Sequence, residues 1–223
     1  MVSMTLGASA PYTRVSRGAL ERNLRALDSN GAIDLRRDAC GHGFDTVAAA
    51  AIAAGFSSAR VDSQDVDRAR TCGLDIVSSG EVDPDAVFGL AGHGEQVMSF
   101  VAPVLQTKPL RSGDGVSYGY RFRASHETNA ALVSGGYAQG VVRAIGGQVS
   151  LRLAGREMPI VGRIAMDVCV VDTGDTPVAT GDEATYFGPA VPGFLDDWAR
   201  ASALTPIEIV ATIGAMNRRE VVA

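Results

Sequence analysis

The sequence predicts an α+β fold in which a small α/β part is followed by a β-rich part. Up to about residue 95, helix-like and strand-like stretches alternate, a rhythm typical of βαβ units and a parallel sheet. Beyond that point β-branched and small residues dominate, with turn signals at regular intervals. The hydrophobic fraction of 46% over 223 residues allows a packed core. We therefore expect two domains, 13–95 and 96–223, the second including the N-terminal strand.

Three stretches of the first part have a helical pattern, and two short ones have the pattern of strands. The first helix places leucines at helical spacing on one face, and Ser16 is a suitable N-cap. The other two helices each end before a glycine. The expected helices are 17–29, 44–54 and 64–72, and the expected strands are 57–61 and 74–77. Residues 78–95, rich in Ser and Gly, are either a lid or a simple connection.

The second part is expected to be mostly antiparallel strands with two helices at its end. Ala154-Gly155 separates two of the strands as a tight hairpin would. Pro206 suits the first turn of the last helix. The expected strands are 97–106, 115–123, 129–135, 148–153, 157–164, 167–172 and 183–187, and the expected helices are 194–201 and 206–214.

Charge and composition exclude several classes of function. The net charge is −5, and the arginines are scattered among carboxylates, which argues against a nucleic-acid-binding face. No apolar run reaches the roughly 18 residues of a membrane span. Met1–Met4 show no start of a signal peptide, so we expect a cytoplasmic protein. The three cysteines are widely spaced and are expected to be reduced thiols.

Several motifs in the second part point to one family. In order and spacing they resemble the C-terminal β-domain of alanine racemase, of an actinobacterial type. The segment Val116-Ser117-Tyr118-Gly119 extends the resemblance upstream, so that it covers roughly residues 95–223. The motifs are Gly136–Gly140 (GYAQG), Pro159–Asp167 (PIVGRIAMD), Gly181–Ala184 (GDEA), Tyr186–Gly188 (YFG), Asp197–Ala199 (DWA) and Thr205–Val210 (TPIEIV).

The first part carries a second resemblance, with a notable departure. Arg36–Gly43 (RRDACGHG) resembles the family's K-A-D-A-Y-G-H-G segment, whose lysine holds pyridoxal phosphate (PLP) as a Schiff base. Arg36 stands where the family has that lysine, and Cys40 stands where it has a tyrosine. A guanidinium stays protonated and does not form an imine with an aldehyde. We therefore expect no PLP and no other cofactor.

The barrel that would surround PLP is also too short. A complete eight-stranded barrel takes roughly 250 residues, far more than 13–95 provide. The resemblance therefore implies a truncated (β/α) barrel remnant. The chain has a single lysine, Lys108. By the same resemblance it lies in a surface connection of the β-domain, where it would not replace the missing amine.

The resemblance also implies a site shared by two subunits. The family tyrosine that matches Tyr137 is an acid/base group that reaches into the active site of the other subunit. Met166 and Asp167 match residues that line its entrance. We therefore expect a homodimer, which would also cover the open edges of a partial barrel. The alternative is that these residues merely build tight turns and the subunit contact.

The candidate site therefore combines residues from both parts of the chain. The expected catalytic residues are Tyr137, His42, Arg36 and Asp167. The expected substrate-binding residues are Met166, Asp38 and Cys40. His42 could equally be a turn or supporting residue. Because Cys40 and His42 are only two candidate ligands at adjacent positions, no metal site is expected.

Three functions remain open from the sequence. The first is a PLP-independent isomerase or cyclase that acts on a small molecule, possibly in a biosynthetic pathway, through acid/base side chains in a remodelled pocket. The second is a non-catalytic binding or regulatory protein. The third is a PLP-dependent amino-acid racemase. None of the three involves nucleic acid or a membrane.

Overall fold

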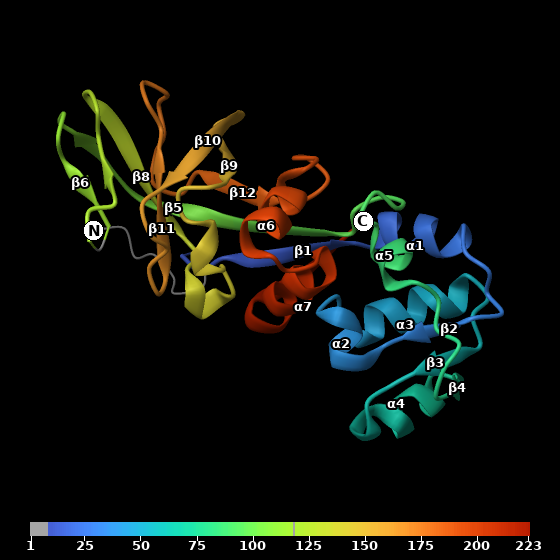
Figure 1. Ribbon diagram of the computed structural model, residues 1–223. Coiled ribbons are helices and arrows are strands. Elements are labelled where there is room, and N and C mark those ends of the chain that lie inside the picture. Colours follow the sequence, from blue (N-terminus) through green and yellow to red (C-terminus); the bar gives the residue numbers. More distant parts are fainter. Residues whose placement is uncertain (1–8, 118) are drawn as a thin grey trace. The chain divides into compact units, whose positions relative to one another are not determined.

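The computed structural model describes residues 9–117 and 119–223, which divide into two compact units (Figure 1). Unit 1 comprises 99–204, with 9–12 and 216–218. Unit 2 comprises 13–98, 205–215 and 219–223. The expectation about a signal peptide concerns Met1–Met4, which lie outside the described residues, as does Tyr118. Each unit contains chain segments far apart in sequence, so neither is a simple N- or C-terminal half.

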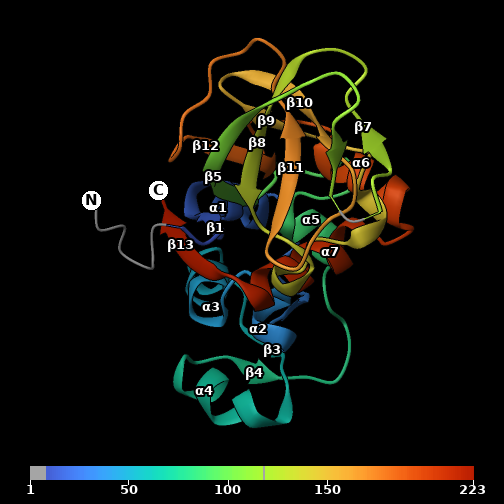
Figure 2. The same cartoon turned by 90° about the vertical axis from the view of Figure 1, so that its left-hand side faces the viewer.

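Unit 1 is built on six antiparallel strands in the order β12-β9-β10-β11-β8-β5 (Figure 2). Because β12 also pairs with β5, the row of strands closes into a barrel. Closure removes the exposed sheet edges at which other chains could pair. The strands are β5 (Met98–Leu110), β8 (Thr128–Ser134), β9 (Ser150–Leu153), β10 (Arg156–Val161), β11 (Val168–Asp172) and β12 (Glu183–Phe187).

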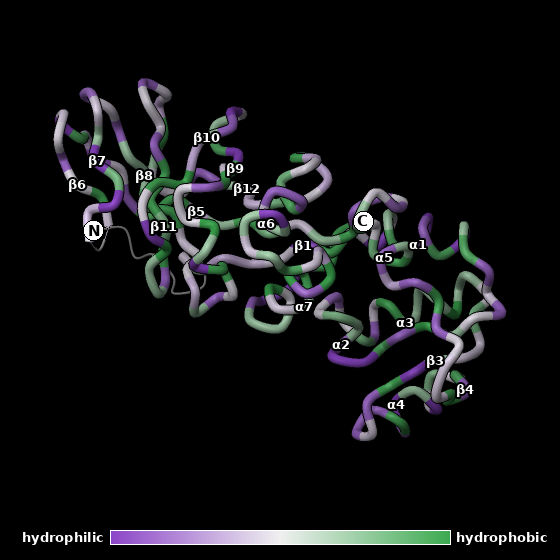
Figure 3. The backbone as a smooth tube through the Cα atoms, in the orientation of Figure 1, coloured by the Kyte–Doolittle hydropathy of each residue, from purple (hydrophilic) through white to green (hydrophobic). Residues whose placement is uncertain are grey.

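Most strands of the β-rich part lie close to their predicted positions, and the hairpin at Ala154-Gly155 is confirmed. Both turn residues have positive φ, 49° and 75°, and Arg156 pairs with Leu153. A two-residue turn of this kind matches the twist of the strands it joins. In Figure 3, hydrophobic residues run along β8 and β11. This is the pattern expected where strands face a core.

Two predictions about this part are wrong. Residues 115–123 do not form one strand, because positive φ angles at Ser117, Gly119 and Tyr120 turn the chain back. Two short paired strands result, β6 (Gly115–Val116) and β7 (Phe122–Arg123). Lys108 does not lie in a connection. It lies within β5, opposite Ala130, because that strand continues through a bulge after Val104.

An aromatic cluster fills the core of unit 1. Trp198 comes from helix α6 (Phe194–Ser202), is fully buried and meets Tyr186 and Phe187 edge-on. Phe100 stacks on Tyr186 with ring centroids 4.9 Å apart. Edge-to-face and offset contacts of this kind add stability beyond the burial of area. The Tyr186 hydroxyl donates to Ser134 O at 2.7 Å, whereas the buried Trp198 Nε1 has no hydrogen-bond partner among the described residues.

Unit 2 contains three parallel strands in the order β2-β3-β4, alternating with helices. The strands are β2 (Ala32–Asp34), β3 (Ser58–Arg60) and β4 (Asp75–Ile76). The helices are α1 (Arg17–Arg25), α2 (Arg36–Cys40), α3 (Phe44–Ala53), η1 (Ser63–Asp65), α4 (Val66–Thr71), α5 (Pro84–Phe88) and α7 (Pro206–Met216). Strands β1 (Tyr12–Ser16) and β13 (Arg218–Val222) neighbour each other, and each has residues in both units.

The local signals of unit 2 are mostly confirmed. The Ser16 side chain accepts from Ala19 N and caps α1, although that helix ends at Arg25 rather than 29. Residues 78–95 are not simply a loop, because they contain α5, capped by Asp83. Val87 and Phe88 of this helix are buried. Across the ranges 9–117 and 119–223, none of the helices has the length and apolar character needed to cross a bilayer.

Candidate functional site

The segment Arg36–Gly43 of unit 2 has an unusual backbone. Four consecutive residues other than glycine, Arg37 to Cys40, have φ between 51° and 56°. Left-handed turns of L-residues cost roughly 1–2 kcal/mol per residue and are concentrated at functional sites. Backbone hydrogen bonds, such as the 2.9 Å bond from Gly43 N to Asp38 O, hold the turn closed. The sequence gives no local sign of this conformation.

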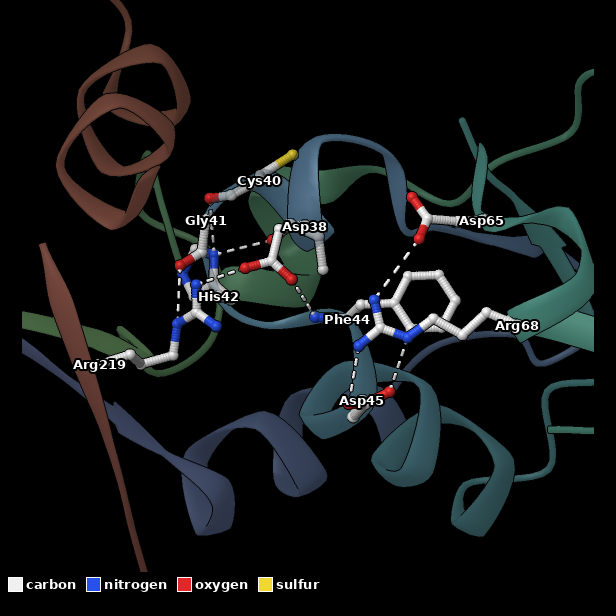
Figure 4. Close-up of polar contacts among 10 residues, drawn as sticks. Asp38, Cys40, Gly41, His42, Phe44, Asp45, Asp65, Arg68 and Arg219 are labelled. Carbon is white, nitrogen blue, oxygen red and sulfur yellow. Dashed lines mark hydrogen bonds and ion pairs between the residues drawn. The ribbon is translucent and has the colours of Figure 1, made fainter. Parts of the chain in front are cut away.

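Asp38 fixes this segment in place (Figure 4). One carboxylate oxygen accepts from the backbone N of Phe44 at 2.7 Å, at the start of α3. The other accepts from the Arg219 guanidinium at 2.6 Å. Arg219 also donates to Gly41 O at 3.1 Å. Asp38, predicted to bind substrate, is therefore occupied with contacts that hold the left-handed turn.

His42 is enclosed within unit 2. Its side chain is fully buried and stacks on Phe88, with ring centroids 3.8 Å apart. Nδ1 faces Ala39 O at 3.2 Å and Cys40 O at 3.1 Å. Burial lowers the pKa of His42 to about 3, although the two carbonyls oppose the shift. The imidazole is therefore neutral at physiological pH, which favours a supporting role over acid/base catalysis.

Neither Arg36 nor Cys40 is in a reactive state. The Arg36 guanidinium donates from Nε to Asp34 at 2.9 Å and forms a close ion pair with it through Nη2. The hydrogen bond to Asp34 raises the pKa of Arg36. Burial, followed by the charge of Asp34, raises the pKa of the half-buried Cys40 thiol to about 11. A protonated thiol is a poor nucleophile and a poor metal ligand.

The residues of this segment do not fit PLP held as a Schiff base. That linkage needs a primary amine, and position 36 has a guanidinium already bound to Asp34. The single lysine, Lys108, lies instead in unit 1, where it lines a cavity of about 350 Å³. Within the described ranges no three His, Cys, Asp or Glu side chains are grouped so that they could hold a metal ion.

Tyr137 lies at the surface of unit 1. It begins a short turn of 3₁₀ helix, η2 (Tyr137–Gln139), and its side chain is 42% exposed. The Arg143 guanidinium, at the start of η3 (Arg143–Ile145), lies 5.2 Å from the centre of the phenol ring. A cation over an aromatic face is attracted by the ring quadrupole. The turn therefore presents a phenol and a guanidinium together.

Gln139 ties this turn to the other two candidates of unit 1. Its Oε1 accepts from Gly136 N at 3.0 Å, and its Nε2 donates to Asp167 at 3.1 Å. The carbonyl of Gln139 accepts from Asn217 at 2.8 Å. A carboxylate at position 139 could not donate to Asp167, whereas the amide can. Asp167 is thereby held beside the turn, and its neighbour Met166 is 53% exposed.

The seven candidates thus fall into two groups. Arg36, Asp38, Cys40 and His42 lie in unit 2, and Tyr137, Met166 and Asp167 lie in unit 1. Sequence reasoning did not find the contact residues Asp34, Arg219 and Arg143, and it identified Gln139 only as part of the motif Gly136–Gly140. Asp34 is only two residues from Arg36, a spacing at which the ion pair could have been suspected. The partnership of Asp38 with Arg219 spans 181 residues and has no local signal.

A comparison with known protein families shows to which family the chain belongs. The model described as "Alanine racemase, C-terminal domain" matches residues 97–221, more than half of the chain. The chain belongs to the alanine racemase family. The match covers the barrel strands, the Tyr137 turn and the end of the chain. It does not include the Arg36–Gly43 segment.

Individual alanine racemases are similar to more than half of this chain. The alanine racemase of Mycobacterium leprae is 41% identical over 139 residues, which is 57% of this chain and 36% of that protein. The alanine racemase of Thermobifida fusca is 44% identical over 119 residues, which is 52% of this chain and 32% of that protein. The matched region thus spans about a third of these curated relatives.

Solved structures extend the likeness in fold to almost the whole chain. Alanine racemase from Streptomyces coelicolor aligns with a TM-score of 0.79 at 20% identity, covering 98% of this chain and 100% of that one. Histidine racemase from Leuconostoc mesenteroides aligns with a TM-score of 0.79 at 15% identity, covering 96% and 98%. At these identities the alignments establish fold alone.

The buried His42 predicts a specific pH dependence of stability. Its folded pKa, about 3, lies below its ordinary 6.5, so the unfolded chain binds more protons between these values. The contribution of neutral His42 is complete above about pH 6.5. It is lost as the pH falls towards 3, at up to about 1.4 kcal/mol per pH unit. The free energy of unfolding, measured with urea at several pH values from about 4.5 to about 7.5, should rise less steeply with pH for His42→Gln than for the unsubstituted protein.

The exposed His126 provides the matched control. His126→Gln removes a histidine of the same kind from the surface of unit 1 and should leave the pH slope unchanged. Equal slopes for His42→Gln and the unsubstituted protein would contradict the buried, neutral state of His42.

Proposed function

We propose that this protein is a member of the alanine racemase family that has given up Schiff-base PLP chemistry and binds a small molecule without catalysing its conversion. One observation carries the proposal. Three side chains of the segment that resembles the family's lysine-bearing motif are engaged in contacts within unit 2. Arg36 is paired with Asp34, Asp38 with Arg219, and His42 is buried against Phe88.

We further propose that residues 13–95 are a trimmed barrel remnant and that 96–223, with the N-terminal strand, are the β-domain, although 205–215 and 219–223 belong to unit 2. Three parallel strands alternating with helices support this view, because this is the arrangement of successive βα units. In the trimmed form the left-handed turn remains, yet its side chains serve packing. This explains how the shape of the motif could persist after its amine was replaced.

The proposed loss of Schiff-base PLP chemistry is tested by chemical trapping. After incubation with PLP and borohydride reduction, intact-mass spectrometry should show no increase equal to one reduced cofactor. Lys108 is the only side-chain amine in the sequence, so Lys108→Arg is the matched control. A stoichiometric adduct that disappears in Lys108→Arg would contradict the proposal and restore the PLP-dependent alternative.

A second candidate function, acid/base catalysis without PLP, is favoured by Tyr137. Its phenol is exposed and lies beside the Arg143 guanidinium, and a positioned phenol can exchange a proton with a substrate. Asp167 is held nearby through Gln139. In this candidate function Tyr137 would move a proton on a small substrate, as in an isomerase or cyclase. His42 and Arg36 would contribute only through the fold.

Solvent exchange separates the two candidates. In D₂O, a catalyst of this kind should exchange the α-hydrogen of an amino acid for deuterium, which NMR detects. Tyr137→Phe should slow this exchange by at least about 100-fold. Tyr118→Phe is the control variant, because it removes a tyrosine hydroxyl from another segment, Val116–Gly119, that resembles the family. No exchange by the unsubstituted protein supports the binding function. Exchange that survives Tyr137→Phe removes Tyr137 from the mechanism.

We also propose that two copies associate through unit 1. Three large apolar side chains around Gln139 are exposed: Tyr137 at 42%, Met166 at 53% and Met216 at 55%. Gln139 forms hydrogen bonds with Asp167 and Asn217, the sequence neighbours of the two methionines, so the three chain segments lie close together. An apolar surface of this kind is typical of protein contacts.

Light scattering after size exclusion should therefore give the mass of a dimer at micromolar concentration. Met166→Glu should shift the protein towards the monomer, because a charge would be buried in the contact. Ile52→Glu is the control, since Ile52 is 41% exposed but belongs to unit 2. A monomeric unsubstituted protein would refute the dimer.

A further inference from the structure

A cavity of about 630 Å³ in unit 1 is lined by three arginines. They are Arg121, Arg143 and Arg163. Phe122, Gly146 and Gln148 contribute to the remaining wall. The cavity is within the roughly 300–1,000 Å³ typical of small-molecule sites. None of the candidate residues predicted from the sequence lines it, although Arg143 also contacts Tyr137.

The charge of this cavity is one-sided. Its lining contains no aspartate or glutamate. In the part of the chain that the structure describes, no carboxylate forms an ion pair with any of the three guanidiniums. Arg22 and Arg68 of unit 2 pair with Glu95 and Asp45, whereas Arg152 and Arg156 of unit 1, like the cavity arginines, have no ion pair among the described residues. What distinguishes Arg121, Arg143 and Arg163 is that all three line one cavity.

The cavity wall is fixed by close backbone packing. A Cβ atom at Gly146 would lie 2.6 Å from Gly162 O, so only glycine fits there. A Cβ atom at Gly162 would lie 2.4 Å from the hydroxyl of Ser117, which in turn accepts from Arg163 N at 2.7 Å. The segments that carry Arg143 and Arg163 therefore pack closely against each other.

We propose that this cavity binds an organic phosphate. Arginine forms forked, charge-assisted hydrogen bonds with phosphate oxygens, and a doubly charged group would offset the repulsion among three cations. Phe122 supplies an apolar surface against which a ring or other non-polar body can pack. The inference rests on the binding function proposed above and names its ligand class.

Calorimetry with phenyl phosphate tests the proposal, because this probe combines a phosphate with an aromatic ring. It should bind more tightly than inorganic phosphate, and phenol, which lacks the charge, should not bind. Arg143→Gln and Arg163→Gln should each weaken binding by at least about tenfold, as expected for the loss of a charged hydrogen bond. The exposed Arg156, also in unit 1 but outside the cavity, gives the control variant Arg156→Gln, which should bind normally.

Three outcomes would overturn the inference: no binding of phenyl phosphate at millimolar concentration, equal binding of phenol, or unchanged binding by both arginine variants. If an arginine variant does not fold correctly, the affinity of the unsubstituted protein for phenyl phosphate is measured at increasing salt concentration instead. Binding between guanidinium groups and phosphate must weaken with added salt, so an affinity independent of salt would overturn the inference. Failure here is distinct from failure of the binding function. The latter would show as solvent exchange or a PLP adduct, neither of which depends on how phenyl phosphate binds.

Discussion

The pairing of β12 with β5 is the constraint on which the organisation of unit 1 depends. Glu183 to Phe187 lie antiparallel to Phe100 to Pro103, and this ladder joins the two ends of a six-strand row. The closed barrel leaves none of these strands as an edge, and the aromatic cluster around Trp198 is built on its closing strands β5 and β12. The turns that leave such a barrel are anchored at both ends. Tyr137, Asp167 and the cavity arginines all belong to these connections or lie next to them.

In unit 2 the corresponding constraint is the ion pair of Asp38 with Arg219. The left-handed turn from Arg37 to Cys40 is unfavourable for L-residues, so neighbouring contacts must stabilise it. Asp38 does so from both sides, through the start of α3 and through a strand at the far end of the chain. Close packing of Gly41 against Gly214 adds a second restraint, since a Cβ on Gly214 would lie 2.3 Å from Gly41 O.

The two units differ in what their polar residues do. In unit 2, carboxylates and guanidiniums neutralise each other, and the one buried imidazole is kept uncharged by its surroundings. In unit 1, a phenol and several guanidiniums remain exposed to solvent or to a cavity. This contrast is why the proposals about ligand and partner rest on unit 1.

Much of the local structure follows from the sequence by itself. Periodicity, the Ser16 cap and the Ala154-Gly155 turn are local effects, decided by neighbouring residues, and they placed most helices and strands within a few positions. The presence of Arg36 and of a single lysine in the chain is equally a property of the sequence. Tertiary structure alone decided that His42 is buried and neutral, that Asp38 is bound to Arg219, and that three distant arginines share one cavity. These features depend on burial and on contacts between residues far apart in the chain, which no local pattern encodes.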